Sequence, residues 1–444
     1  MPDVSVGSQI FDLVFHPSHS TVYTALLSGK VKAVSYDKEG NHKQQFSIKL
    51  SQKSCRSITI NSDGTRLYAA GKGKGIHTLD TETGKVTESR VKAHETSINR
   101  VKHVQPWLFA TGDDDGVIKL WDSRKKECLR TYKHHFDYIT DFLWLNDTKH
   151  LVATSEAVHP SSTGDGTLSV LDIRSKKAEP FAHSEDQEDE LLSIVSIKGG
   201  AKVIVGTQIG VLSVFNRSSG WGDCVDRIPG HPHSVDALCA LPLSLPNVDS
   251  SSTILTGSSD GFLRAVHIFP TKLGGVVADH GDWPVERIAI GEGMNQLSLD
   301  DDNTGEESRD GSVHKAKSSD EDDGDEPEAK TSSGVWWAGS VGHDETLKLT
   351  DIGLFFNQEN GLSDDDNQDA DSFNDSEEDA TASATPGDFG RHQDIEKQAK
   401  DSDDEAVEDD SGRKKRKRKN KDPMAVKKKG KNEVEVQGSF FDEL

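Results

Sequence analysis

The chain has 444 residues, a formal net charge of −24 at pH 7 and 33% hydrophobic residues. A charge of that sign argues against strong nucleic-acid binding by the whole molecule, and the lack of a long apolar run predicts no membrane span. The four cysteines are scattered and form no C-x-x-C pair, which predicts a reducing compartment, no disulfides and no cysteine zinc site. The first residues lack a basic stretch followed by an apolar core, so no secretory signal is expected.

A weak repeat returns about every 40 to 50 residues, a period typical of repeat folds. Each copy has a β-rich run, a tight Gly/Asp turn and a second β-rich run, and the clearest copy is FATGDDDGVIKLWD, Phe109 to Asp122. The copies end, in chain order, at Asp37, Asp80, Asp122, Asp172, Asn216, Phe269 and Asp351. Seven copies predict an all-β fold, a seven-bladed WD-repeat β-propeller over residues 1–356, whose closed ring leaves no long sheet edge open.

The first and last blades can be assigned from their strand patterns. The first blade is expected in IFDLVFHP, TVYTALLSG and KVKAVSYD, from residue 10 to residue 37, and the seventh in WPVERIAIG, GVWWAGSVG and ETLKLTDIG, from residue 283 to residue 353. An acidic disordered insertion at about 300–333 interrupts the seventh, and Glu156 to Ser162 lengthens a hairpin of the fourth. We expect Pro2 to Val6 to pair with the last blade and clasp the ring.

The third blade carries a set of polar side chains at meaningful spacing. Asp115-Gly116 between alternating apolar runs predicts a hairpin turn. In WD repeats a buried His, Ser/Thr, Asp and Trp share hydrogen bonds, and the matching positions here are His94, Thr111, Asp115 and Trp121. The sixth blade matches at His231, Thr256 and Asp260, but Val266 replaces Trp, as Leu171 does in the fourth. The signature is therefore predicted to be complete in one blade only.

The motifs of enzymes and cofactor sites are missing. AAGKGKG at residues 69–75 lacks the spacing of a phosphate loop and is interpreted as a hairpin turn. His134-His135 lies between the third and fourth blades and is interpreted as a structural histidine of the repeat. Without H-E-x-x-H or G-x-S-x-G, we expect a protein that is not an enzyme and holds no cofactor and no metal.

One short motif has a more specific alternative. WDSR, residues 121–124, is similar to the W-D-x-R box of propellers that dock on the cullin-4 ubiquitin ligase adaptor, and Asp172 to Arg174 partly repeats it. The candidate docking residues are Asp122, Arg124 and Arg174. The alternative is an ordinary strand end followed by a basic turn, which we favour.

The tail changes sign abruptly. Residues 357–411 are acidic and almost free of apolar side chains, which predicts disorder. Residues 412–431 are basic, and their densest cluster is Arg413, Lys414, Lys415, Arg416, Lys417, Arg418 and Lys419. Such a cluster favours nuclear import or nucleolar retention, and it is also suited to weak RNA contact, since each cation can displace a condensed counterion. The alternative is a solvated run that balances the acidic residues.

Two further features of the acidic and terminal segments suggest regulation and docking. An acidic residue lies three places after each of Ser319, Ser363, Ser376 and Ser402, a pattern that acidophilic kinases of the casein kinase 2 type prefer. Residues 432–444 end in SFFDEL, and Phe440, Phe441 and Leu444 after a long polar stretch are interpreted as a short docking motif.

The whole chain resembles the WD-repeat-containing protein 55 family of eukaryotes, including its fungal members. The resemblance rests on IFDLVFHP, AAGKGKGIHTLD, AHETSINRV with ATGDDDGVIKLWD, VWWAGSVGHDETLKLTDIG, the acidic-then-basic tail and SFFDEL. It implies a nucleolar protein without catalytic activity that is required for ribosomal RNA processing and large-subunit assembly.

Three functions follow from these features. The first is a monomeric propeller scaffold in nucleolar ribosome biogenesis that binds pre-ribosomal assembly factors or ribosomal proteins. The second is a substrate receptor of a cullin-4 ligase. The third is an acidic chaperone for basic ribosomal proteins or histones, acting through residues 300–330 or 357–411.

Overall fold

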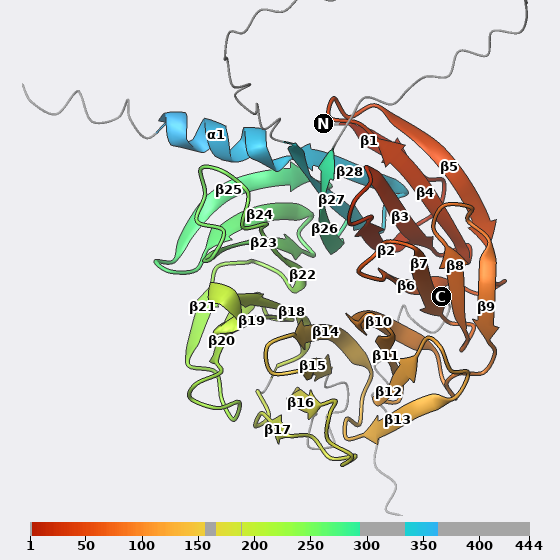
Figure 1. The fold of residues 1–444 in the computed structure, drawn as a ribbon. Coiled ribbons are helices and arrows are strands. Elements are labelled where there is room, and N and C mark those ends of the chain that lie inside the picture. The colour runs from red at the N-terminus through yellow and green to blue at the C-terminus, as the bar shows by residue number, and fades with distance from the viewer. Residues whose placement is uncertain (1, 156–165, 188, 294–333, 363–444) are drawn as a thin grey trace, which may run out of the picture. The chain divides into compact units, whose positions relative to one another are not determined.

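The computed structural model of the chain describes residues 2–155, 166–187, 189–293 and 334–362. Within these ranges the chain forms seven antiparallel sheets of four strands each, arranged around a common centre (Figure 1). The first strand of each blade contacts the first strand of the next, and the seventh returns to the first, so the ring is closed. This arrangement confirms the predicted seven-bladed propeller.

Within each of the first six blades, the strands pair in chain order from the centre outward. The first three blades are β2 (Ile10–Phe15), β3 (Thr21–Leu26), β4 (Lys30–Tyr36), β5 (His42–Lys49); β6 (Cys55–Ile60), β7 (Arg66–Gly71), β8 (Ile76–Asp80), β9 (Val86–Arg90); and β10 (Ile98–Gln105), β11 (Leu108–Asp113), β12 (Val117–Asp122), β13 (Cys128–Lys133). The next three are β14 (Ile139–Leu145), β15 (His150–Ser155), β16 (Leu168–Asp172), β17 (Ala182–His183); β18 (Leu191–Ile197), β19 (Lys202–Thr207), β20 (Val211–Asn216), β21 (Asp226–Pro229); and β22 (Val235–Ala240), β23 (Thr253–Ser258), β24 (Phe262–His267), β25 (Lys272–Asp279). A 3-10 turn, Lys198–Gly200, links β18 to β19.

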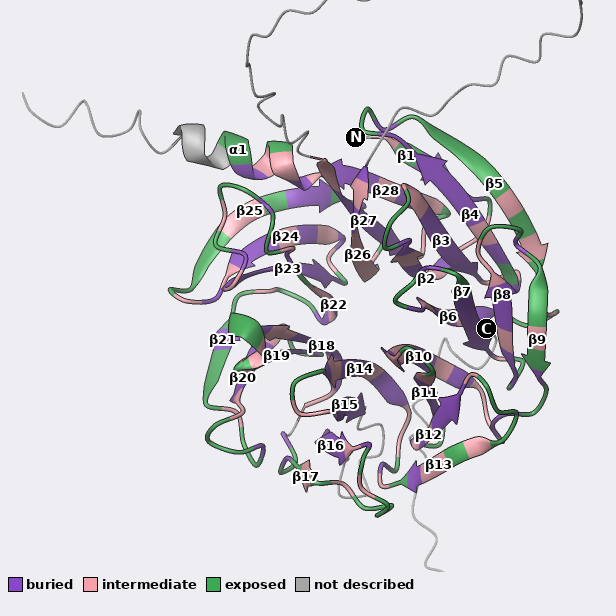
Figure 2. Cartoon of the chain, viewed as in Figure 1, coloured by how far each residue is buried: buried purple, intermediate pink, exposed green. Residues whose placement is uncertain are grey.

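The core lies between the blades. Each sheet packs against a neighbour on both faces, so the two middle strands are buried almost throughout and contain long apolar runs, as in TVYTAL of β3. Outer strands such as β5 face water and are rich in polar side chains. Figure 2 shows this gradient, from buried middle strands to the exposed β5 and β9.

The last blade joins the two ends of the propeller. It contains β26 (Val285–Gly293), β27 (Val335–Gly342), β28 (Thr346–Asp351) and, as its outermost strand, β1 (Asp3–Ser5) from the beginning of the chain. Ser5 pairs with Thr346, and Val4 is buried in the cluster that joins the first and seventh blades. The predicted clasp is therefore confirmed. The insertion at about 300–333 and Glu156 to Ser162 lie outside the described residues.

A helix that the sequence analysis did not predict follows the last strand. Helix α1 (Ile352–Leu362) begins inside the predicted propeller and crosses the boundary that we had placed at Phe356. Ile352 and Phe356 lie one turn apart and are both buried in the cluster shared by the sixth and seventh blades. This apolar pair anchors the helix, and the sequence pattern of one turn was too short to predict it.

The connecting loops lie on two faces. The hairpin face holds the turns between second and third strands and the loops that lead into inner strands, which touch where His94 N–H bonds to Lys74 O at 3.2 Å. The opposite face, which we call the pocket face, holds the loops between first and second strands and those between third and fourth strands. These loops meet where Ser123 N–H bonds to Trp107 O at 2.8 Å.

Candidate functional site

The third blade contains a buried chain of hydrogen bonds. His94 Nδ1 lies 2.7 Å from Asp113 Oδ2, His94 Nε2 lies 2.6 Å from Thr111 Oγ1, and Trp121 Nε1 donates to Thr111 Oγ1 at 2.8 Å. An indole only donates and a carboxylate only accepts, so in the neutral imidazole the donors run in one direction: Trp121 to Thr111 to His94 to Asp113. All four residues are buried. Three of the four predicted residues are therefore brought together.

The prediction that Asp115 is the fourth member of this set was wrong. Asp115 is exposed in the turn, and Asp113 takes its place at the end of β11. Strand side chains alternate, so Thr111 and Asp113 share a face, whereas the chain has already turned at Asp115. Asp113 Oδ1 also accepts the N–H groups of Asp115 and Val117, at 3.1 and 2.8 Å. Gly116 has the expected positive φ of 71°.

Other blades use shorter versions of the same device. His135 lies 3.0 Å from Ser155 Oγ and 2.6 Å from Ser169 Oγ, which confirms that it is structural. In the sixth blade His231 lies 2.9 Å from Thr256 Oγ1. The prediction that Asp260 is a further partner of His231 was wrong, since the Asp260 carboxylate pairs with Arg264 at 2.6 Å.

A histidine–hydroxyl pair in the seventh blade was missed. His280 Nε2 lies 2.8 Å from Ser340 Oγ, and both residues are buried. The signal was a histidine before an inner strand, as at His94. The long insertion between His280 and Ser340 hid their relationship in the sequence. Leu171 and Val266 are buried where the third blade has Trp121, as predicted.

The W-D-S-R residues form an ion pair on the pocket face between the buried Asp122 and the exposed Arg124. Arg124 Nε and Nη2 donate to Asp122 Oδ1 and Oδ2 at 2.9 and 2.8 Å, which lowers the pKa of Asp122 to about 2. The guanidinium lies 5.4 Å from the ring centre of Trp107, and both side chains keep substantial exposure, 58% for Arg124 and 46% for Trp107. Arg174 makes the same pair with Asp172 at 2.9 and 3.0 Å.

The predicted sites of the tail and the acidic insertion lie outside the described residues. These are the seven cations from Arg413 to Lys419, the candidate phosphorylation sites Ser319, Ser363, Ser376 and Ser402, and the terminal Phe440, Phe441 and Leu444. Among the described residues, no three His, Cys, Asp or Glu side chains gather as metal ligands would. The described helices include none long and apolar enough to cross a membrane.

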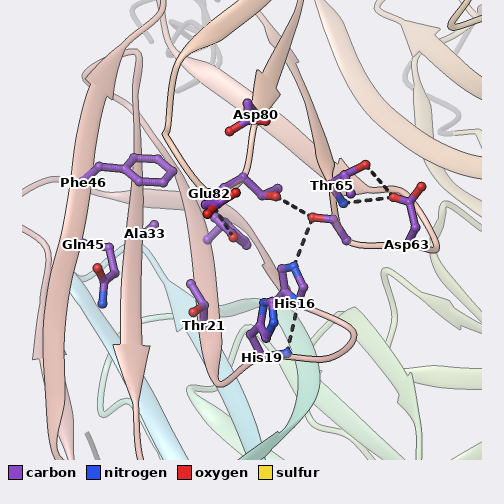
Figure 3. Close-up of a pocket in the computed structure, with 13 residues that line it drawn as sticks. His16, His19, Thr21, Ala33, Gln45, Phe46, Asp63, Thr65, Asp80 and Glu82 are labelled. Carbon is purple, nitrogen blue, oxygen red and sulfur yellow. Dashed lines mark hydrogen bonds between the residues drawn. The ribbon is translucent and has the colours of Figure 1, made fainter. Parts of the chain in front are cut away.

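A pocket that the sequence did not reveal opens between the first two blades on the pocket face. Its volume is about 350 Å³. Figure 3 shows rings of the first blade, such as His16 and Phe46, and carboxylates of the second, Asp63, Asp80 and Glu82, around this space. It is lined by His16, His19, Thr21, Tyr23, Ala33, Gln45, Phe46, Asp63, Gly64, Thr65, Asp80, Thr81 and Glu82.

The floor of the pocket is a bridge between the two blades. The Gly64 carbonyl lies 3.1 Å from His16 Nε2 and accepts the Thr81 hydroxyl at 2.6 Å. His16 Nδ1 accepts the backbone N–H groups of Ser18 and His19, both at 3.1 Å. The Nδ1 must therefore lack a proton while Nε2 carries one, so His16 is held neutral, and burial lowers its pKa further.

Gly64 is required at this place for two reasons. Its φ is 77°, and a Cβ there would lie 2.4 Å from the His16 ring. The blade-to-blade bridge therefore depends on the absence of a side chain at this position.

The pocket walls combine negative charge with aromatic surface. Thr65 and Thr83 donate hydrogen bonds to Oδ1 of Asp63 and Asp80, both at 2.7 Å, and these bonds lower the pKa of each carboxyl. The ring of His19 stacks on His16 at 4.3 Å, and Tyr23 lies 6.1 Å from Phe46. None of the thirteen lining residues is Lys or Arg.

The comparisons with known proteins agree on one family. The model of the family WDR55 matches residues 1–302. A WD repeat-containing protein JIP5 from Laccaria bicolor is 49% identical over an alignment that covers 100% of both chains. WD repeat-containing protein 55 from Arabidopsis thaliana is 34% identical, covering 65% of this chain and 76% of the relative, and its namesake from Bos taurus is 35% identical, covering 65% and 71%.

Proposed function

The chain belongs to the WDR55 family of WD-repeat proteins, and from this premise we propose that it is a non-catalytic scaffold in nucleolar ribosome biogenesis, acting in ribosomal RNA processing and large-subunit assembly. One observation carries the scaffold role: in the closed ring, buried polar groups such as His94, Thr111 and Asp113 are hydrogen-bonded to one another. These groups hold the shape of the blades, and the exposed loops of the two faces are left to bind other proteins.

Two features of the sequence support the nucleolar part of the proposal. The cluster from Arg413 to Lys419 has the composition of an import or nucleolar-retention signal. The same segment is suited to weak RNA contact. The partners would be pre-ribosomal assembly factors or ribosomal proteins.

Sedimentation of cell extracts tests the proposal. We expect the tagged protein to migrate with large-subunit precursors, and its depletion to raise the level of unprocessed ribosomal RNA precursors on a northern blot. Migration only with free protein, together with unchanged precursor levels, would reject the proposal.

Localisation tests the basic segment separately. Alanine at all seven positions from Arg413 to Lys419 should move a fluorescent fusion out of the nucleolus. Alanine at four lysines of the propeller, Lys30, Lys43, Lys49 and Lys53, is the control and should leave the signal in place. An undiminished nucleolar signal in the tail variant would assign targeting to another part of the chain.

A second candidate, docking on the cullin-4 ligase adaptor, is favoured by one observation. Arg124 remains 58% exposed beside Trp107 even though its guanidinium pairs with Asp122. If the box is used, Arg124→Ala should abolish recovery of the adaptor in a pull-down, while Ser123→Ala should not. Equal recovery with both variants would leave the box as an ordinary strand end.

A further inference from the structure

We propose that the pocket between the first two blades receives a lysine or arginine side chain from an extended basic segment of a protein partner. The inference rests on the proposed scaffold function and deepens it, since it specifies the chemistry of the partner. It is carried by the cavity, by the charge of its walls and by its rigid floor.

The first step concerns charge. Asp63, Asp80 and Glu82 come from two loops of the second blade and line one cavity. The hydroxyls of Thr65 and Thr83 donate hydrogen bonds to Oδ1 of Asp63 and of Asp80. Each carboxylate is therefore oriented through one of its two oxygens. Arg66 and Lys85 lie near these carboxylates but are not among the lining residues. The cavity therefore favours a cation from outside and disfavours phosphate.

His16 does not oppose a cation. Both ring nitrogens of His16 are engaged, one with the Gly64 carbonyl and one with backbone N–H groups, so the ring is held in its neutral form. His19 stacks on that neutral ring. His16 thus adds no positive charge beside the carboxylates.

The second step concerns shape. A volume of about 350 Å³ is at the lower limit for small-molecule sites, and it suits one long side chain better than a large ligand. Phe46 and Tyr23 supply apolar surface for the methylene stem of a lysine or arginine, with the carboxylates at the polar end. Phe46 itself packs against Gly84, where a Cβ would lie 2.7 Å from the ring.

The third step concerns preorganisation. His16, Gly64 and Thr81, which all line the cavity, link the two blades through hydrogen bonds. A site built on such a floor loses little conformational freedom when it binds.

Binding of a labelled peptide to the full-length protein tests the proposal. The probe is a fluorescein-labelled ten-residue peptide with three arginines and one lysine in a Gly/Ser background, and the reference peptide has glutamine at those four positions. We expect anisotropy to show binding of the basic peptide only. The double variant Asp63→Asn, Asp80→Asn should weaken it at least tenfold, because asparagine keeps an acceptor for each threonine but removes the charge.

Matched variants separate the pocket from general electrostatics. The double variant Asp114→Asn, Asp115→Asn also removes two charges, but it lies on the hairpin face, so it should change the affinity less than twofold. Equal losses in the two double variants, or no loss in the pocket variant, would overturn the proposal. Melting curves of both variants verify that the protein is folded.

A third variant identifies the source of the basic segment. Full-length protein with alanine at Arg413 to Lys419 should bind the peptide with unchanged affinity. A tenfold increase would show that the chain's own tail occupies the pocket, and it would overturn the assignment to a partner. Because peptide binding is measured on purified protein, its failure leaves the sedimentation result for the scaffold function intact.

Discussion

Replacing Asp113 by alanine should destabilise the propeller far more than the same change at Asp115, two residues along the chain. Asp113 is buried at the end of β11, and its carboxylate accepts from His94 and from two backbone N–H groups of the turn. Alanine removes all three hydrogen bonds at once. Asp115 is exposed in the turn, and its replacement leaves the network intact.

The size of the effect follows from the groups left without partners. A buried donor that loses its acceptor costs about 1–3 kcal/mol, and His94 Nδ1–H is such a donor. The two turn N–H groups are closer to water and add roughly 1 kcal/mol together. The free energy of unfolding should therefore fall by about 2–4 kcal/mol in Asp113→Ala and by less than about 0.5 kcal/mol in Asp115→Ala, as for surface changes in general.

Urea denaturation followed by tryptophan fluorescence measures both variants. Trp121 belongs to the network, so its emission reports on the same blade. If Asp115→Ala proved as damaging as Asp113→Ala, or if Asp113→Ala changed the unfolding free energy by less than about 0.5 kcal/mol, the assignment of the network would be wrong.

Three further changes test other parts of the structure. Gly64→Ala should lower the melting temperature more than Gly199→Ala, since both glycines have positive φ but only at Gly64 would the new Cβ strike a neighbour, and equal shifts would contradict the proposed floor of the pocket. The contribution of His16 to stability should fall as the pH drops from about 7.5 to 5.5, because the unfolded chain then takes up a proton that folded His16, with its lowered pKa, does not. His16→Gln should reduce this slope of the urea midpoint against pH, and an unchanged slope would exclude His16 as a source. Deleting Pro2 to Val6 should expose the edge of β28 and the apolar side chains that Val4 covers. We therefore expect a lower melting temperature, and aggregation that rises with protein concentration in light scattering. A monomeric deletion variant of full stability would show that the clasp is dispensable.

The repeat in the sequence predicted the ring because each blade is local. Its strands follow one another at short range, and in the third blade the Asp115-Gly116 turn marks the hairpin, so the pattern of one blade fixes its own pairing. The clasp was also predictable, since a closed ring needs a last strand for its open edge. The choice between Asp113 and Asp115 failed where three aspartates stand in a row, and only the alternation along β11 separates them.

The pocket could not be predicted, because it exists only between blades. His16 and Gly64 are 48 positions apart, and no local motif contains both. Its carboxylates look like ordinary turn aspartates in the sequence, where Asp63 and Asp80 each precede a threonine within three positions. The packing of the first blade against the second closes the space that these side chains line.

The pairing of β1 with β28 also sets an order of events during synthesis. Ser5 and Thr346 are about 340 residues apart, and a ribosome that adds roughly 5–20 residues per second needs roughly 20–70 seconds to make the partner strand. Until then Ile10, Leu13 and Phe15 lack the seventh-blade side chains that bury them in the finished ring. The nascent chain therefore carries an uncovered apolar flank and an unpaired leading strand for most of its translation, a state that chaperones at the tunnel exit would have to shield.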